Sequence, residues 1–369
     1  MKKEKILSYI IFLVIGGIMG AILGRYLATS KSSYPELAYA LFCLILSFYA
    51  SVIIHEGGHF VMGHLTGYTF VSFRIGSLTW IKGDGKLLLK RFHIPGTGGQ
   101  CLLMPPESEK PEEVPFFLYH LGGGLFNFIT AGIFLPIGLF CENKYGKAAL
   151  VIFGVWSLLS GLFNLIPMKL QVANDGYNLV ELSRNKSVRV SLYKQLRING
   201  LLYQGYIPSE IPEELFRMED SSKGIYHGIE KMLRGSLFID RKDFGAAEKL
   251  FGECIEDKNL ISIYVSECKS ELLFCKVMNG ASREEIDALY DKELEGYIKA
   301  SGKTQISKKR TMYAYDLIYK RDEAAAEKEY EAAMRMRKTY PALGELKSEL
   351  SLIEYVKEQG FPVPQEGNI

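Results

Sequence analysis

The sequence lacks paired cysteines, and it has little excess charge of either sign. Its six cysteines are scattered without a Cys-x-x-Cys pair, so neither a disulfide framework nor a cysteine zinc cage is expected. Lysine and arginine number 44 against 42 aspartates and glutamates, and no basic stripe is interleaved with aromatic residues. These absences argue against a nucleic-acid partner and favour free thiols in a reducing compartment.

Charged residues are scarce in the first half of the chain and common in the second, with the change at residues 182–186. A helix needs about 20 apolar residues to cross a bilayer. Four segments of suitable length and composition occur before the change: 6–24, 36–55, 115–141 and 148–168. We therefore expect an α-helical polytopic membrane protein with about four transmembrane helices, followed by an all-α cytosolic domain.

The distribution of lysine and arginine predicts how the chain is oriented. Lys2, Lys3 and Lys5 precede the first span, and six more basic residues lie between the second and third spans. Because basic residues accumulate on the cytosolic side, both termini are expected in the cytosol. Residues 1–35 are predicted to be a retained anchor, since their apolar stretch is longer than that of a signal peptide. The short external loops suit a multi-pass protein of a bacterial plasma membrane.

The second span ends in the sequence His55-Glu56-Gly57-Gly58-His59. Helical residues four apart share a face, so His55 and His59 can bind one metal ion. Glu56 lies beside them and can act as a general base, and Zn²⁺ suits imidazole ligands while keeping a position open for water. The alternative is a pair of core histidines, but ionisable residues in an apolar span are costly and usually functional.

A third ligand must come from another segment, and Asp175 is the best candidate. It follows the fourth span, whose C-terminal end is expected on the same side as that of the second span. Gly176 would let the backbone turn directly after it. In the alternative interpretation, Asp175 caps a helix over residues 176–183.

Three motifs in this order resemble those of the site-2 protease family of intramembrane zinc metalloproteases. The first is the His-Glu-x-x-His sequence at residues 55–59. The second, Gly122–Asn127, resembles the family's Gly-Pro-x-x-Asn element, with Gly124 in the place of the proline. The third is Asn164-Leu165-Ile166-Pro167 with Asp175-Gly176, which resembles an Asn-x-x-Pro…Asp-Gly element with a longer spacer.

The resemblance covers about residues 36–182, which we take as the intramembrane protease core. It implies Zn²⁺ bound by His55, His59 and Asp175, with Glu56 as the base. The expected substrate is a membrane-spanning protein or peptide within the lipid bilayer. Asn127 is a polar residue in an apolar span, and we predict that it contacts the substrate; alternatively, it ties helices together.

The loop at residues 66–106 is expected to contain a β-hairpin. Residues 69–75 and 86–92 have the composition of short strands, with Gly83-Asp84-Gly85 as a turn signal between them. A glycine-rich turn at 96–101 leads into a further extended stretch. The family resemblance suggests that a strand here pairs with the unwound substrate, whereas the alternative is a hairpin that only covers the site.

The second half, residues 187–369, has apolar residues at helical spacing. The sequence Asp243–Phe251 is echoed by Asp322–Tyr330, which predicts degenerate helical hairpins similar to tetratricopeptide repeats. Such helices would provide a surface for a cytosolic protein partner, although they could equally pack only for their own stability.

The leading hypothesis is an intramembrane zinc metalloendopeptidase, and two other interpretations compete with it. One is a non-proteolytic membrane adaptor that recruits partners through its cytosolic helical domain. The other is a zinc peptidase with a soluble catalytic face and a downstream glutamate ligand, which the Asp175-Gly176 match disfavours.

Overall fold

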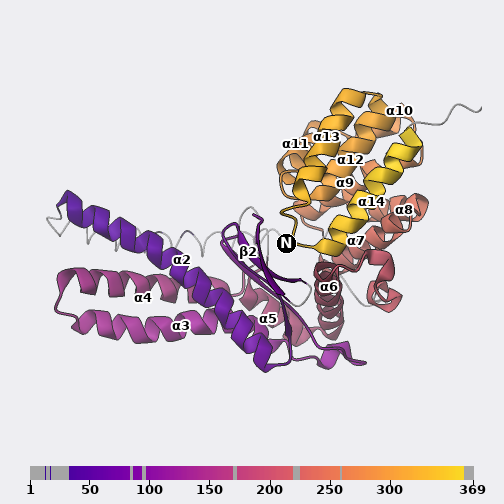
Figure 1. Ribbon diagram of the computed structural model, residues 1–369. Coiled ribbons are helices and arrows are strands. Elements are labelled where there is room, and N and C mark those ends of the chain that lie inside the picture. Colours follow the sequence, from indigo (N-terminus) through magenta and orange to yellow (C-terminus); the bar gives the residue numbers. More distant parts are fainter. Residues whose placement is uncertain are drawn as a thin grey trace, which may run out of the picture. The chain divides into compact units, whose positions relative to one another are not determined.

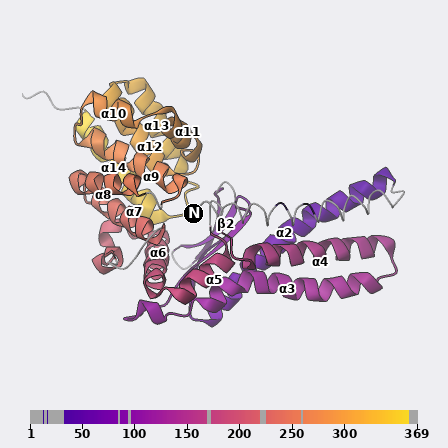
Figure 2. The ribbon, with the colours of Figure 1, turned by 180° about the vertical axis from the view of Figure 1, so that it is seen from behind.

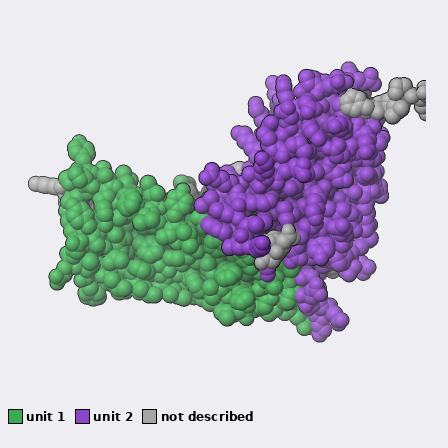
Figure 3. All heavy atoms as spheres, viewed as in Figure 1, with its two compact units in different colours: residues 1–75, 97–106, 113–186 green, residues 76–96, 107–112, 187–369 purple. Residues whose placement is uncertain are grey.

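The computed structural model describes residues 13, 17, 33–83, 86–93, 97–168, 173–218, 225–257 and 260–360. It is mostly helical and has one small antiparallel sheet (Figure 1). The expected first span, 6–24, lies outside the described residues except for Leu13 and Gly17. The chain forms two compact units, one of residues 1–75, 97–106 and 113–186 and the other of residues 76–96, 107–112 and 187–369 (Figure 3).

Three long helices make up most of the first unit: α2 (Tyr34–Leu65), α3 (Phe117–Phe140) and α4 (Lys144–Leu165). They lie side by side in both views of the ribbon (Figures 1 and 2). Each belongs to a segment long and apolar enough to cross a membrane, and these are the three such segments among the described residues. They match the expected spans 36–55, 115–141 and 148–168, and α2 continues ten residues past His55.

Helix α2 has small and polar residues on its buried face and large apolar residues on its exposed face. Its buried residues are Cys43, Ser47, Ser51, His55, Glu56, Gly58, His59 and Gly63. Its exposed residues include Leu41, Phe42, Ile45, Leu46 and Ile53. A helix of a water-soluble protein has the opposite pattern, whereas small and polar residues at helix interfaces are typical of helices surrounded by lipid.

Glycines allow the three helices to approach closely. A β-carbon on Gly58 of α2 would overlap the carbonyl oxygen of Gly122 on α3, and one on Gly122 would overlap the carbonyl oxygen of Gly58. Gly124 faces the side chain of Leu165 on α4 with no room for a β-carbon. A proline ring at position 124 would meet the same obstacle, which gives a packing reason for glycine there.

The strands are β1 (Thr69–Ile75), β2 (Leu78–Gly83), β3 (Lys86–Arg91) and β4 (Gly99–Met104), in the sheet order β3-β2-β1-β4. The expected strands at 69–75 and 86–92 are present, but they do not pair with each other, so the expected hairpin is wrong. Strand β3 pairs with β2, which the sequence analysis missed, and β1 pairs with β4. Asp84 and Gly85 of the predicted turn Gly83-Asp84-Gly85 lie outside the described residues.

Helices also make up most of the second unit, whereas α5 (Asp175–Arg184) belongs to the first. The helices of the second unit are α6 (Lys186–Gln204), α7 (Ile225–Asp240), α8 (Phe244–Glu256), α9 (Ser262–Met278), α10 (Arg283–Leu289), α11 (Lys292–Ser301), α12 (Ile306–Ala314), α13 (Glu323–Met336) and α14 (Leu343–Gly360). Among the described residues, the short helical turns are η1 (Pro111–Glu113), η2 (Pro208–Glu210), η3 (Glu213–Phe216) and the π-helical η4 (Tyr315–Lys320).

The two echoed sequences form the same local structure. Asp243 and Asp322 cap α8 and α13, where their carboxylates accept the amide hydrogens of Ala246 and Ala325. Each cap follows a residue in the left-handed region, Lys242 at φ 61° and Arg321 at φ 55°. A helical hairpin therefore turns in the same way at two places 79 residues apart along the chain, 322 − 243.

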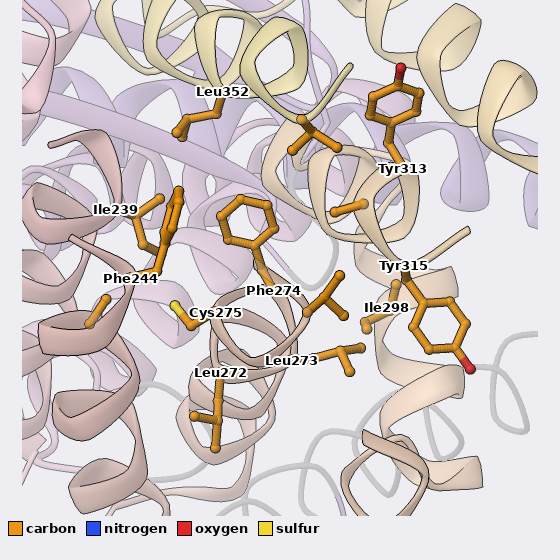
Figure 4. Packing of buried hydrophobic residues seen from close by; sticks show 14 of the residues in the cluster. Ile239, Phe244, Leu272, Leu273, Phe274, Cys275, Ile298, Tyr313, Tyr315 and Leu352 are labelled. Atoms are coloured by element: carbon orange, nitrogen blue, oxygen red, sulfur yellow. The ribbon is translucent and has the colours of Figure 1, made fainter. Parts of the chain in front are cut away.

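The core of the second unit is an apolar cluster centred on α9, where Leu272, Leu273, Phe274 and Cys275 are buried (Figure 4). Strands β2 and β3 belong to this compact unit, whereas the sequence analysis included them in the predicted protease core 36–182. The Lys90 ammonium donates a 2.5 Å hydrogen bond to the Tyr340 carbonyl. Phe92 packs edge-on against the Tyr340 ring, with 5.5 Å between centroids.

Candidate metal centre

The three predicted ligands lie together in the first unit. Two are one helical turn apart on α2, and the third is the first residue of α5. The Nε2 atoms of His55 and His59 are 3.1 Å apart. The Asp175 Oδ2 atom lies 3.2 Å from the first and 3.3 Å from the second. The three side-chain atoms thus form a nearly equilateral triangle. Among the described residues, these three side chains are the group that could hold a metal ion.

The size of this triangle fits zinc. Zinc binds imidazole nitrogen and carboxylate oxygen at about 2.0–2.1 Å, usually as a tetrahedron. The edge of a tetrahedron is about 1.63 times the bond length, so neighbouring ligand atoms should be about 3.3 Å apart for these bonds. The observed edges of 3.1–3.3 Å are close to this value. Two imidazoles and one carboxylate could therefore supply one face of a zinc tetrahedron, which would leave its fourth corner for water or substrate.

Asn174 holds Asp175 in place at the start of α5. Its amide nitrogen donates to the carbonyls of Phe163 and Ile166 at the end of α4, at 2.6 and 2.7 Å. Its amide oxygen accepts the amide hydrogens of Met168 and Tyr177 at 3.0 and 2.9 Å. The helix cap is therefore Asn174 and not Asp175. This assignment leaves the Asp175 carboxylate available to a metal.

Gly176 has a role that differs from the expected turn. It lies inside the first turn of α5, and its φ angle is not positive. A β-carbon there would overlap the carbonyl oxygen of Leu165. The glycine therefore lets the start of α5 pack against the end of α4, and this close packing brings Asp175 to the histidines.

The charge state of Asp175 suits a ligand. Burial alone would raise the pKa of its carboxyl group, but the charge of His59 and hydrogen bonds from His120, His55 and His59 hold this pKa well below its usual range. His120 lies on α3 with its Nδ1 atom 4.0 Å from Asp175 Oδ1. Its own Nε2 atom is buried without a hydrogen-bond partner among the described residues. The sequence analysis did not single out His120.

Each ligand histidine has a different partner at Nδ1. His59 Nδ1 lies 2.7 Å from the backbone carbonyl oxygen of Tyr119. His55 Nδ1 lies 3.2 Å from the side-chain amide of Asn127. Gly123, between these two partners on α3, faces both rings, because a β-carbon there would lie 2.5 Å from His55 Cε1 and from His59 Nε2. Only a residue without a side chain fits α3 against both histidines.

Glu56, the predicted base, lies between the metal ligands and strand β4. Its carboxylate accepts a hydrogen bond from the Cys101 amide. A β-carbon on Gly99 would lie 2.8 Å from Glu56 Oε1, so the strand approaches the carboxylate through a glycine. The Tyr119 hydroxyl donates to the Cys101 carbonyl at 3.0 Å. The edge of β4 that does not pair with β1 therefore faces the candidate catalytic residue.

The structure brings His55, Glu56, His59, Asp175 and Asn127 into one site. The expected contact between Asn127 and substrate stays a prediction, while its observed partners are His55, Ser51 and Ser160. Sequence reasoning missed Ser51 and Ser160. Ser51 precedes His55 by one helical turn, and this spacing is the only signal that would have indicated it.

Comparisons with protein-family models, with curated proteins and with solved structures give no match for this chain. The case for its function therefore depends on the site itself.

Proposed function

We propose that this chain is an intramembrane zinc metalloendopeptidase that hydrolyses peptide bonds of membrane-embedded substrates, as the resemblance to the site-2 protease family implies. The observation that carries the proposal is the triangle of His55 Nε2, His59 Nε2 and Asp175 Oδ2, with edges of 3.1–3.3 Å. Its size fits three corners of a zinc tetrahedron. A carboxylate in the position of a general base lies next to it.

The surroundings of the site support the membrane part of the proposal. His55 is 21 residues from the start of α2, or about 30 Å along a helix, which is about the thickness of the hydrocarbon core of a bilayer. Another ten residues of α2 follow His55. The exposed faces of the bundle are apolar, and Ile129, Ile133 and Ile137 continue on α3 the pattern seen on α2. We propose that α2, α3 and α4 cross a bacterial plasma membrane, with both chain termini and the helical domain in the cytosol.

The roles of the side chains follow from their positions. His55, His59 and Asp175 would hold Zn²⁺, which supplies an activated water and polarises the scissile carbonyl. Glu56 takes the proton of the attacking water and passes it to the leaving amine. Strand β4 ends the sheet next to Glu56. A substrate extended along this strand would present its peptide bonds to the base, which a helical substrate cannot do.

The test is cleavage of a single-span membrane protein by the full chain in detergent, with Glu56→Gln as the key variant. The variant keeps the size and polarity of the side chain but cannot accept a proton. We expect wild-type cleavage, at least a 100-fold loss in Glu56→Gln by the usual size of a general-base contribution, and equal zinc content in both. Equal cleavage by both proteins would contradict the assignment of Glu56. Zinc without cleavage of any membrane substrate by the wild type would refute the proposed protease function.

A further inference from the structure

The Asn127 side chain connects all three long helices at His55. Its amide nitrogen lies 3.2 Å from His55 Nδ1 on α2 and 2.9 Å from Ser160 Oγ on α4. Its amide oxygen lies 3.3 Å from Ser51 Oγ, also on α2. Asn127 and Ser51 are both fully buried, with 0% of their surface exposed. Every polar atom of the amide thus has a partner within the bundle.

The chemistry of metal binding determines which way this amide must face. A neutral histidine that offers its Nε2 lone pair to a metal carries its proton on Nδ1, and that N–H needs an acceptor. His59 has a fixed acceptor in the Tyr119 carbonyl. At His55 the corresponding position is occupied by the Asn127 amide, which can turn either an NH₂ group or an oxygen toward the ring.

Both amide orientations satisfy the rest of the network. The hydroxyls of Ser51 and Ser160 can each donate or accept. With the oxygen toward His55, Asn127 accepts from His55 Nδ1 and from Ser160, and donates to Ser51. With the NH₂ group toward His55, the imidazole proton moves to Nε2 and blocks the lone pair needed by a metal. Only the first orientation is compatible with a metal at the site.

We propose that Asn127 is a positioning residue of the metal centre, whose carbonyl oxygen accepts the His55 Nδ1 hydrogen and thereby selects the metal-binding tautomer. This inference rests on the proposed zinc site. It is an alternative to the expected substrate contact, because every polar atom of this fully buried amide already has a partner within the bundle. Ser51 and Ser160 hold the amide in place from the helices on either side of α3.

The experiment measures zinc affinity of the metal-free full chain in detergent, by competition with a coloured chelator, for Asn127→Asp and Asn127→Leu. Aspartate has the same shape and, when ionised, can only accept at His55, whereas leucine can neither accept nor donate. We expect Asn127→Leu to weaken zinc binding by about 10–100-fold, the usual effect of losing a partner of a metal-bound histidine. Asn127→Asp should bind zinc at least as tightly as the wild type.

The matched control is Thr130→Val, which also removes a buried polar group from α3. The Thr130 hydroxyl donates to the Phe126 carbonyl on its own helix at 2.8 Å. We expect its replacement to change zinc affinity less than threefold. Asn127→Leu with wild-type zinc affinity would overturn the inference. If that variant does not fold, weak zinc binding by the folded isostere Asn127→Asp would overturn it equally.

A second measurement separates this role from a substrate contact. At saturating zinc, Asn127→Leu should regain its cleavage rate with an unchanged KM for a membrane substrate. A raised KM with unchanged zinc affinity would assign Asn127 to the substrate instead. If the wild type binds zinc but cleaves no substrate, the protease proposal fails while the zinc affinities still test Asn127.

Discussion

Each proposed ligand atom is presented to the metal position by a second residue that is itself held in place. His59 is oriented by the Tyr119 carbonyl, and the Tyr119 hydroxyl is bonded to β4. Asp175 follows Asn174, whose side chain makes four hydrogen bonds to the ends of α4 and α5. Because these supports are backbone groups and an asparagine amide, the triangle of candidate ligands is set by the packing of the helices rather than by the ligands alone.

The two glycines within the metal-binding motif should respond differently to substitution. A β-carbon on Gly58 would overlap the backbone of α3, whereas one on Gly57 would have no atom within 4 Å. We expect Gly58→Ala to destabilise the protein by about 1–3 kcal/mol, as overpacking usually does, and to weaken zinc binding because α3 must move away. Gly57→Ala is the matched control and should leave both unchanged. Thermal unfolding in detergent and zinc affinity measure the effects, and equal behaviour of the two variants would refute this packing.

The sequence predicted the three clustered side chains better than the residues that support them. Residues four apart on a helix must share a face, so His55 and His59 followed from spacing alone, and Asp175 followed from a motif. The partners of Asn127 did not, because they depend on how α2, α3 and α4 are rotated against one another. That rotation is set by close contacts such as Gly58 with Gly122, which no single segment reveals.

At the level of secondary structure, the long helices were easier to predict than the strands. Apolar runs of 20 or more residues have few alternatives to a helix, and α2, α3 and α4 appear where they were expected. Strand β2 was missed because it begins shortly after Gly76 and ends at Gly83, which the sequence assigned to the turn. The sequence also did not indicate that β4 would pair with β1, whose expected partner was the strand at 86–92, since pairing partners depend on tertiary context.

Helix α14 carries a carboxyl group whose titration should affect stability. Burial raises the pKa of Glu345 to about 7, with a further contribution from the charge of Glu349, although a 2.7 Å hydrogen bond from the Tyr340 hydroxyl acts in the opposite direction. In the unfolded chain this carboxyl group should titrate near its ordinary value of 4.5. The unfolded state therefore loses its proton first as the pH rises, which favours unfolding.

The sign of the effect follows from these two pKa values. The stability contribution of protonated Glu345 is complete below pH 4.5 and is lost as the pH rises to about 7. We expect Glu345→Gln to remove about 1–2 kcal/mol of the loss of stability between pH 5 and pH 8, because glutamine stays neutral. Glu331→Gln, at an exposed position of α13, is the control. The measurement is thermal unfolding at both pH values, and an unchanged pH dependence in Glu345→Gln would contradict the assignment.

For the whole molecule, the sequence predicted an apolar half and a charged helical half. The structure has the long apolar helices α2, α3 and α4 in the first half and the helices α6–α14 in the second. It did not predict how the chain is divided between compact units. Residues 76–96 and 107–112 belong with the helical second unit, although the β4 strand between them belongs with the first. Side chains far apart in sequence cause this division, as Lys90 and Phe92 do when they contact Tyr340.

The most direct test of the account is the zinc content of the full chain, purified in detergent, compared with that of Asp175→Ala. Three ligand atoms at tetrahedral spacing predict about one zinc ion per wild-type chain. Asp175→Ala removes one ligand without adding bulk, and it should retain little or no zinc. A wild type that binds no zinc, or an Asp175→Ala variant that binds it as fully and as tightly as the wild type, would contradict the proposed metal centre.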